Sequence, residues 1–311
     1  MKRAIVYIFL AALALATVSM LTGCTGFRTS SYANADRYTA GDAEFTEEIK
    51  RIEIDWPSGS VNLLTHAQDT VLLSEAVEEG MPEELRVHWW LEEGTLHVQF
   101  ATSGAKQRAF NSWRKELTLT VPETLSLDDI EIRTASATVA ADALTAETLD
   151  VTTASGSIRI DCAANAIHLK SASGSVQLAQ RDSAAEVRID TASGRIDAAL
   201  GHVDAAELES ASGRIALTAA SLDSLSAKTA SGAIRCELEA APSTCRLRAT
   251  SGDVALSLPE HADFTAKVST TSGDFESDFA LKKEGRSYIC GSGSAGIEID
   301  TTSGDVSIRK N

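Results

Sequence analysis

Serine is a potential nucleophile, and this chain carries it at a nearly fixed interval. A Ser-Gly pair preceded by alanine or threonine recurs, as in VTTASGSIRI, RIDTASGRID and LESASGRIAL. A catalytic serine needs a base and an orienting group beside it, and no histidine or acidic column accompanies these serines. We therefore interpret the repeat as structural and predict no catalytic residues. The pairs begin at Ser155, Ser173, Ser193, Ser212, Ser231, Ser251, Ser272 and Ser303, with a degenerate copy at Ser136.

Residue types that bind metals are present but scattered. Asp253, Asp274 and Asp305 each follow a Ser-Gly pair, which leaves a weak cation site open, yet the glycine-rich calcium nonapeptide pattern is absent. The six histidines lack metal-ligand spacing, and no Cys-x-x-Cys pair occurs. We predict no metal and no cofactor. Acidic residues of distant coils can still meet in a solenoid, so glycoside chemistry stays an alternative.

The N-terminus has the order of a lipoprotein signal. Lys2 and Arg3 precede the apolar run AIVYIFLAALALATVSM, and LTGC then ends at Cys24. Small residues ahead of a cysteine resemble the lipobox of bacterial lipoproteins, so we predict a signal peptide over residues 1–23 and lipid attachment at Cys24. A transmembrane anchor, or a secretory signal with an accidental cysteine, is the alternative. The expected location is extracytoplasmic, with the membrane as a partner through the lipid.

The residues after the signal predict a tether, and the overall charge argues against one class of partner. Residues 24–44 lack apolar periodicity and are rich in Ser, Thr, Ala and Gly, which predicts a lipidated N-terminus and flexible tether. The net charge is −16, and cleavage before Cys24 would remove two positive charges and take it to about −18. An acidic chain without a basic block is a poor nucleic-acid binder, because phosphate contacts need clustered Lys and Arg. We therefore predict no nucleic-acid partner.

Apolar and polar residues alternate on both sides of each Ser-Gly pair. The positions six before, four before and three after the serine are apolar in most copies, as at Ile167, Leu169 and Val176. Alternation with period two predicts strands, and the inward parity changes across Ser-Gly, which predicts a bend. A repeat of this length cannot bury a core alone, whereas stacked coils can. We predict an all-β fold, a parallel β-solenoid (β-helix) of about nine 19–20-residue coils over residues 126–311.

The bend is expected to need glycine because glycine adopts positive φ without a Cβ penalty. The serine, and the Thr or Ser two residues before it, should hydrogen-bond along the stack. Outward positions carry mixed charges, as at Lys170, Asp190 and Glu209, which we interpret as a solvated face with modest ion pairs. The predicted structural corner glycines are Gly156, Gly174, Gly194, Gly213, Gly232, Gly252, Gly273 and Gly304.

Two of the remaining cysteines fall in the inward columns. Cys236 and Cys245 lie on successive predicted strands joined by the turn ELEAAPST. Outside the cytoplasm this pair can form a disulfide, and two buried free thiols are the alternative.

Residues 45–125 carry the repeat only in degenerate form. They are predicted to form an N-terminal β layer that caps the first coil, since the terminal units of a stack differ from internal ones. Trp89 and Trp90 are adjacent, so in a strand they face opposite sides. One is expected in the core, and the other is a candidate surface patch for a sugar, lipid or protein.

The succession RIEIDWPSGSV, TLHVQF, LTLTVPETLSLDDIEIRTASATV and LDVTTASGSI resembles the DUF4097 family of bacterial adhesin-like domains. The resemblance covers about residues 45–311, with Ala137 as a departure at the first corner of the solenoid. It implies a β-helical extracytoplasmic domain, associated in some members with envelope stress systems, and it implies no catalytic residues.

We therefore expect a non-enzymatic surface lipoprotein of the cell envelope, with a binding or scaffolding solenoid. Its expected partner is an envelope polymer, a protein or a peptide. One alternative is a carbohydrate-active enzyme on a β-helix, which would need exposed acids concentrated in a groove. Another is an acidic sensor or decoy for cationic envelope-active peptides, whose affinity should fall with salt.

Overall fold

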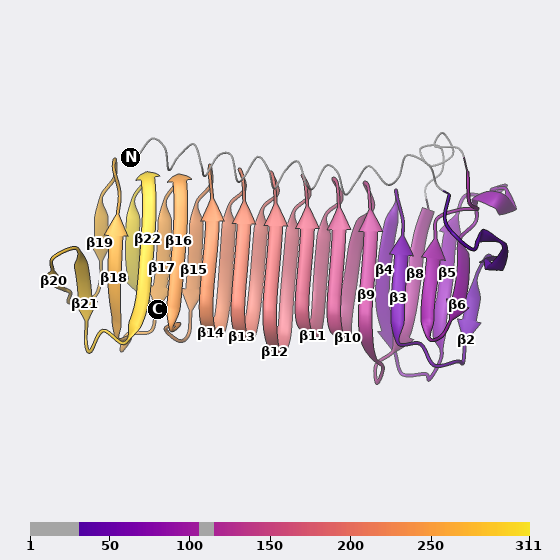
Figure 1. The fold of residues 1–311 in the computed structure, drawn as a ribbon, viewed down its shortest axis with the longest axis horizontal. Helices are drawn as coiled ribbons and strands as arrows, with labels where there is room; N and C mark the ends of the chain where they lie inside the picture. Colours follow the sequence, from indigo (N-terminus) through magenta and orange to yellow (C-terminus); the bar gives the residue numbers. More distant parts are fainter. Residues whose placement is uncertain (1–30, 106–114) are drawn as a thin grey trace. The chain divides into compact units, whose positions relative to one another are not determined.

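The computed structural model describes residues 31–105 and 115–311 (Figure 1). The predicted signal peptide and Cys24 lie outside the described residues. Contacts divide the chain into two compact units that meet in the sequence between Gly174 and Ser175. Within the described ranges, no helix has the length and apolar character needed to cross a membrane.

The N-terminal unit is built of strands and two short 3-10 turns. The prediction of an all-β solenoid is confirmed here by parallel pairing of successive long strands, as between β10 and β11. Its described elements are η2 Ala35–Arg37, β1 Thr39–Ala40, β2 Ala43–Phe45, β3 Arg51–Asp55, β4 Ser60–His66, β5 Val71–Val77, η3 Glu83–Leu85, β6 His88–Glu92, β7 Thr95–Gln99, β8 Lys115–Pro122, β9 Ser126–Thr134, β10 Thr138–Thr153 and β11 Ile158–Ser171.

The first coil in the sequence is not the first in the stack. β3 and β4 flank the bend at Ser58 and Gly59, and β3 pairs in parallel with both β7 and β9. β4 likewise pairs in parallel with β8 and β10. The coil β3/β4 therefore lies between the coils β7/β8 and β9/β10. Solenoid pairing thus extends into residues 51–66, inside the range predicted as a separate cap, and the layer that covers it consists of antiparallel β1, β2, β5 and β6.

The C-terminal unit repeats this arrangement at its own end. β12, β13 and β14 pair in parallel, with partners such as Ile196 and Ile215 and with one register shift between Gln180 and Ser183. The last coil, β22/β23, lies between β16/β17 and β18/β19, and the hairpin β20/β21 adds antiparallel to β18. Its strands are β12 Val176–Thr191, β13 Ile196–Ser210, β14 Ile215–Thr229, β15 Ile234–Leu238, β16 Thr244–Ser251, β17 Val254–Leu258, β18 Phe264–Ser269, β19 Phe275–Ser277, β20 Lys282–Glu284, β21 Ser287–Cys290, β22 Ala295–Ser303 and β23 Val306–Lys310.

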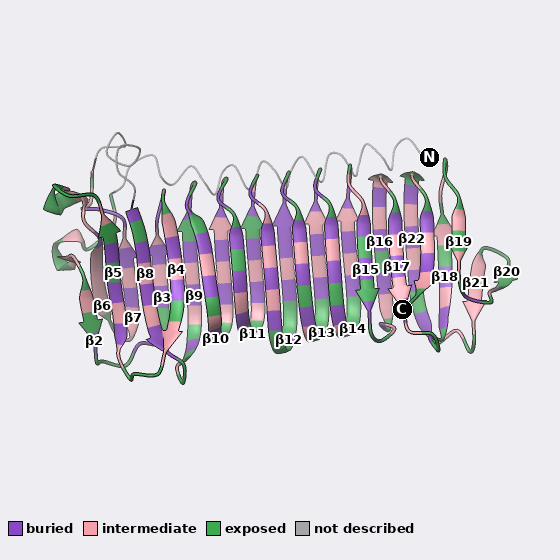
Figure 2. Cartoon of the chain, turned by 180° about the vertical axis from the view of Figure 1, so that it is seen from behind, coloured by how far each residue is buried: buried purple, intermediate pink, exposed green. Residues whose placement is uncertain are grey.

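The cores of both units contain the predicted inward columns, and in Figure 2 buried bands alternate along the strands with intermediate and exposed ones. Val268 and Phe275 are only half-buried, and both belong to the coil β18/β19. Elsewhere the columns exclude water, so the period-two prediction is confirmed. Among residues four before the serine, the exposed fraction is 0% at Ile132, Val151, Leu169, Ile189, Leu208, Ala227, Leu247 and Ile299.

The corner glycines are needed for a different reason from the one predicted. Only Gly252 and Gly304 of the predicted set have positive φ, at 154° each. At Gly213 an added Cβ would instead lie under 3.0 Å from the carbonyl oxygen of Gly194 in the neighbouring coil, a separation that Cβ atoms do not show. The positive-φ explanation is therefore wrong for most corners, and close approach of adjacent coils replaces it. The same clash arises at Gly156, Gly174, Gly232, Gly252, Gly273 and Gly304.

Hydroxyl groups join the corners along the stack. Ser210 Oγ accepts the Gly213 N–H at 2.7 Å and donates to the Gly194 carbonyl oxygen at 3.4 Å. The predicted hydrogen bonding along the stack is confirmed, with backbone groups rather than other hydroxyls as partners. Thr229 and Thr301 make the equivalent bond to the neighbouring coil.

Candidate functional site: the cap pocket

The segment that leads into the cap is ordered where a tether was predicted. Of residues 24–44, the described part carries η2 and β1, and β1 pairs antiparallel with β6. The Tyr32 hydroxyl donates to the Ala101 carbonyl oxygen at 3.0 Å, and the Tyr32 N–H donates to Ser103 Oγ at 3.1 Å. The tether prediction is thus wrong from Tyr32 onward. Tyr32 and Tyr38 pack this segment against the cap, whereas the many small polar residues around them led to the prediction of a tether.

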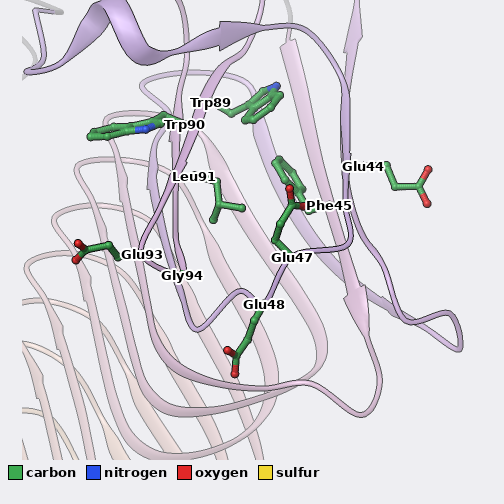
Figure 3. Close-up of a pocket in the computed structure, with 9 residues that line it drawn as sticks. All are labelled: Glu44, Phe45, Glu47, Glu48, Trp89, Trp90, Leu91, Glu93 and Gly94. Atoms are coloured by element: carbon green, nitrogen blue, oxygen red, sulfur yellow. The ribbon is translucent and has the colours of Figure 1, made fainter.

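A pocket of about 470 Å³ lies between β2 with the residues after it and the hairpin β6/β7. Phe45, Trp89 and Leu91 form its apolar wall, as Figure 3 shows. The rings of Phe45 and Trp89 meet edge to face with centroids 4.8 Å apart. Because the antiparallel pairs β1–β6 and β2–β5 hold both walls, the pocket is preformed. Its lining residues are Glu44, Phe45, Glu47, Glu48, Trp89, Trp90, Leu91, Glu93 and Gly94.

Four glutamates surround this apolar wall. In Figure 3 the Glu44, Glu48 and Glu93 side chains point away from this wall, and Glu47 is the fourth acidic residue of the lining. Glu48 pairs with Lys50 at 3.4 Å, and Glu47 accepts a hydrogen bond from the Thr46 N–H. A concave site lined by carboxylates concentrates cations at its mouth. The pocket therefore suits a positively charged group on an apolar stem.

Trp90 leaves β6 on the side opposite Trp89, as predicted for adjacent strand residues (Figure 3). The expectation that one of them lies in the core is wrong: both are half-buried, because β6 belongs to the cap layer rather than to a coil. It stacks on His97 at 5.3 Å and meets Tyr38 at 5.7 Å, and Tyr38 in turn meets Tyr32 at 4.6 Å. We call Tyr32, Tyr38 and Trp90 the aromatic cluster. Burial, and next the carboxylates of Asp55 and Glu53, raises the pKa of Tyr38 to about 12, so its hydroxyl stays neutral.

The chain itself shows how this cap holds a cation. The guanidinium of Arg37 lies over the Trp90 ring, 5.1 Å from its centroid, and pairs with Glu92 at 2.9 Å. An aromatic face and a carboxylate thus share one positive charge.

A buried ion network lies between the strands next to the cap. Glu75 Oε2 accepts hydrogen bonds from Arg86 Nε at 2.8 Å and from the Val87 N–H at 3.0 Å. The Lys115 ammonium pairs with the other carboxylate oxygen and lies 4.7 Å from the centre of the Trp56 ring. Burial lowers the pKa of Lys115 to about 8, against the opposing effect of Glu75. The network ties β5 and β8 to the start of β6.

The two inward cysteines are free thiols in this structure. Cys236 and Cys245 are both buried, and neither forms a disulfide. Burial raises the pKa of Cys245 to about 12, and burial with the neighbouring Cys245 raises that of Cys236. The alternative of two buried thiols therefore describes the structure, and both sulfurs are held in the unreactive protonated form.

The three aspartates after Ser-Gly come together, but they bond to the backbone. Asp253 Oδ1 accepts the Asp305 N–H at 3.0 Å, and Asp305 Oδ1 accepts the Asp274 N–H at 2.9 Å. These hydrogen bonds follow the order of the coils in space, in which the last coil lies between the two that precede it, rather than their order in the sequence. Across residues 31–105 and 115–311, no group of His, Cys, Asp and Glu side chains has a metal-binding arrangement.

The pocket residues were mostly missed at the sequence level. Only the tryptophan pair was singled out, because aromatic residues are scarce in the chain. A usable signal was present in AEFTEE and WWLEEG, where glutamates flank aromatic residues in two segments outside the clean repeat. Their convergence depends on β2 and β6 both lying in the cap layer, which the repeat does not indicate.

Fold and site together define a capped β-solenoid with a preformed pocket in its cap. The chain belongs to the DUF4097 family: the family model, described as Toastrack DUF4097, matches residues 49–309. The sequence matches none of the curated proteins with which it was compared.

Several solved structures are similar to the chain. A proposed lipid-binding protein from Parabacteroides distasonis has 12% sequence identity and a TM-score of 0.48, covering 88% of this chain and 97% of that one. A proposed adhesin from Bacteroides fragilis has 12% identity and a TM-score of 0.43, with the same coverage of both chains. A proposed cell adhesion protein from Clostridium sporogenes has 11% identity and a TM-score of 0.28, covering 88% of this chain and all of that one.

Proposed function

We propose that this chain is an extracytoplasmic lipoprotein, anchored at Cys24, whose solenoid is a non-catalytic scaffold that binds ligand in the cap pocket. The observation that carries the proposal is the pocket itself, in which Phe45, Trp89 and Leu91 share the lining with four glutamates, Glu47 among them. The repeated hydroxyls and glycines are occupied by contacts between coils. The cap is the part of the N-terminal unit that departs from this repetition.

The ligand class follows from the lining. A primary or quaternary ammonium on an apolar stem satisfies both parts, because the stem covers the rings and the charge meets the carboxylates. The contact of Arg37 with Trp90 and Glu92 shows the same chemistry within the chain. The four glutamates also support the acidic sensor or decoy as a second candidate, since cationic peptides carry this group on their lysines.

The outward face carries the ion pairs between coils that its mixed charges predict. Glu207 lies between Arg188 at 2.8 Å and Lys228 at 3.2 Å. Burial alone would raise its pKa, but the hydrogen bond from Lys228 and the charges of Arg188 and Lys228 lower it overall.

Calorimetric titration of residues 25–311 with hexyltrimethylammonium tests the pocket, with hexanesulfonate as the charge-reversed control. We expect binding of the cation only. Glu47→Gln should weaken it a few-fold: a quaternary ammonium makes no hydrogen bond, and a solvent-accessible ion pair contributes about 0.2–1 kcal/mol. Glu123→Gln removes one exposed carboxylate elsewhere in the same unit and should leave affinity unchanged. Equal affinity of wild type and Glu47→Gln would contradict the assignment of the pocket.

The anchor is tested separately by the distribution of the full chain between membrane and soluble fractions. Wild type should sediment with membranes and Cys24→Ser should not, because the acyl chains supply the membrane affinity. Membrane retention of Cys24→Ser would contradict lipid anchoring.

A further inference from the structure

The described structure limits how far the cap can lie from a lipid at Cys24. Tyr32 is fixed to the cap by two hydrogen bonds and by its contact with Tyr38. Seven residues lie between Cys24 and Tyr32, and the eight Cα–Cα steps that join them span at most about 28 Å. If residues 24–44 were all a free tether, the cap could lie more than twice that distance from the lipid. The lipid, where it is attached, therefore keeps the cap close to the bilayer.

We infer that the aromatic cluster is the bilayer-facing surface of the N-terminal unit and meets the lipid headgroups. This inference rests on the proposed anchoring at Cys24. Tyrosine and tryptophan favour the membrane interface, where an apolar ring and a polar tip are both accommodated. All three residues of the cluster are half-buried rather than core residues. The cluster also begins at the point where the covalent path from the lipid reaches the fold.

Trp90 belongs to the cluster and also borders the pocket. Trp90 and Trp89 leave β6 on opposite sides, so their two rings face different ways (Figure 3). The carboxylates of Glu44, Glu47 and Glu93 line the pocket and favour contact with water over contact with lipid phosphates. Beside the cluster, Arg37 neutralises Glu92 at 2.9 Å. The cluster can therefore rest on headgroups at one border of the pocket, while the acidic part of the lining stays in water.

Quenching of tryptophan emission by headgroup spin-labelled lipids tests the contact in the full lipidated chain. The protein is reconstituted into phosphatidylglycerol and phosphatidylethanolamine vesicles with and without the labelled lipid. We expect strong quenching in wild type that is largely lost in Trp90→Phe. Trp56→Phe is the matched control, because Trp56 is fully buried and its removal should leave the quenched amplitude unchanged.

A second variant keeps the test valid if Trp90→Phe perturbs the cap. Inserting twenty Gly/Ser residues between positions 30 and 31 lengthens the covalent path without altering the cluster. The local concentration of headgroups around the cap then falls, so quenching should drop several-fold while membrane recovery is unchanged. Membrane-bound wild type with the same quenching in both variants would overturn the contact alone. Failure of wild type to associate with membranes would overturn the anchor and this inference together. Absent quenching in membrane-bound wild type would overturn the contact alone, and is the result expected if the cluster binds a protein or glycan in place of lipid.

Discussion

At the scale of single residues, the corner glycines were predicted from the repeat, but the physical cause assigned to them was incomplete. Glycine follows the serine at every corner of the repeat except the first, where Ala137 stands, and the predicted cause was backbone conformation. In the structure the cause at Gly213 is distance, since the carbonyl oxygen of Gly194 occupies the place of a side chain. Spacing between coils is not encoded in any one repeat, so the sequence could not distinguish the two causes.

Gly213→Ala should therefore destabilise the C-terminal unit. A Cβ forced against a backbone carbonyl requires adjacent coils to separate, and overpacking of this kind costs about 1–3 kcal/mol. Gly296→Ala is the matched control, because its Cβ would meet nothing closer than the Ser243 carbonyl oxygen at 3.7 Å. Urea denaturation measures both variants, and equal midpoints would show that the coils can separate without cost.

Lys115 makes a second prediction, in the pH dependence of stability. Burial lowers its pKa from 10.5 to about 8 in the folded chain. The unfolded chain then binds more protons than the folded chain between these values, so the contribution of Lys115 to stability rises with pH across this window. The free energy of unfolding of wild type, measured against Lys115→Met, should increase by up to about 3 kcal/mol from pH 8 to pH 10.5. A constant difference between the two proteins would mean that Lys115 does not titrate there.

At the scale of elements, the alternation predicted the strands and their inward faces but not the order of the coils. Every coil offers its neighbours nearly the same inward pattern, as with Ile234, Val254 and Val306. The sequence pattern therefore fits pairing with the next coil in the sequence as well as it fits pairing with a more distant coil. The 31-residue step before Ser303 marked an insertion, and that insertion contains the hairpin β20/β21, which lies between β19 and β22 in the sequence.

The intercalated last coil should control the end of the C-terminal unit. A chain ending at Ser294 lacks β22 and β23, so β18 keeps only its antiparallel partner β21, and β16 loses its outer neighbour. Hydrogen exchange should then show lost protection in β18 and retained protection in β12 to β14, because solenoid coils depend on their nearest neighbours. A peptide of residues 295–311 should restore protection in β18, whereas a scrambled peptide should not. Unchanged protection of β18 in the shortened chain would contradict the observed coil order.

At the scale of the whole molecule, the net charge of −16 raises the question of whether a cation binds the pocket or merely the acidic field. The two effects differ in range. At physiological ionic strength charges are screened over about 8 Å, so distant carboxylates contribute little and those lining the pocket contribute most. Glu47→Gln and Glu123→Gln each remove one negative charge, and therefore change the net charge equally.

The salt dependence of affinity for hexyltrimethylammonium should follow position rather than net charge. Between low salt and physiological salt, wild type and Glu123→Gln should lose affinity by the same factor, since both keep the glutamates of the pocket. Glu47→Gln should bind more weakly at low salt and should lose less affinity as salt is raised, because the substitution has already removed the ionic interaction that salt screens. Parallel losses in all three proteins would instead assign binding to the acidic surface as a whole. In that case the chain would act as a diffuse acidic decoy, and the aromatic wall formed by Phe45 and Trp89 would have only a packing role.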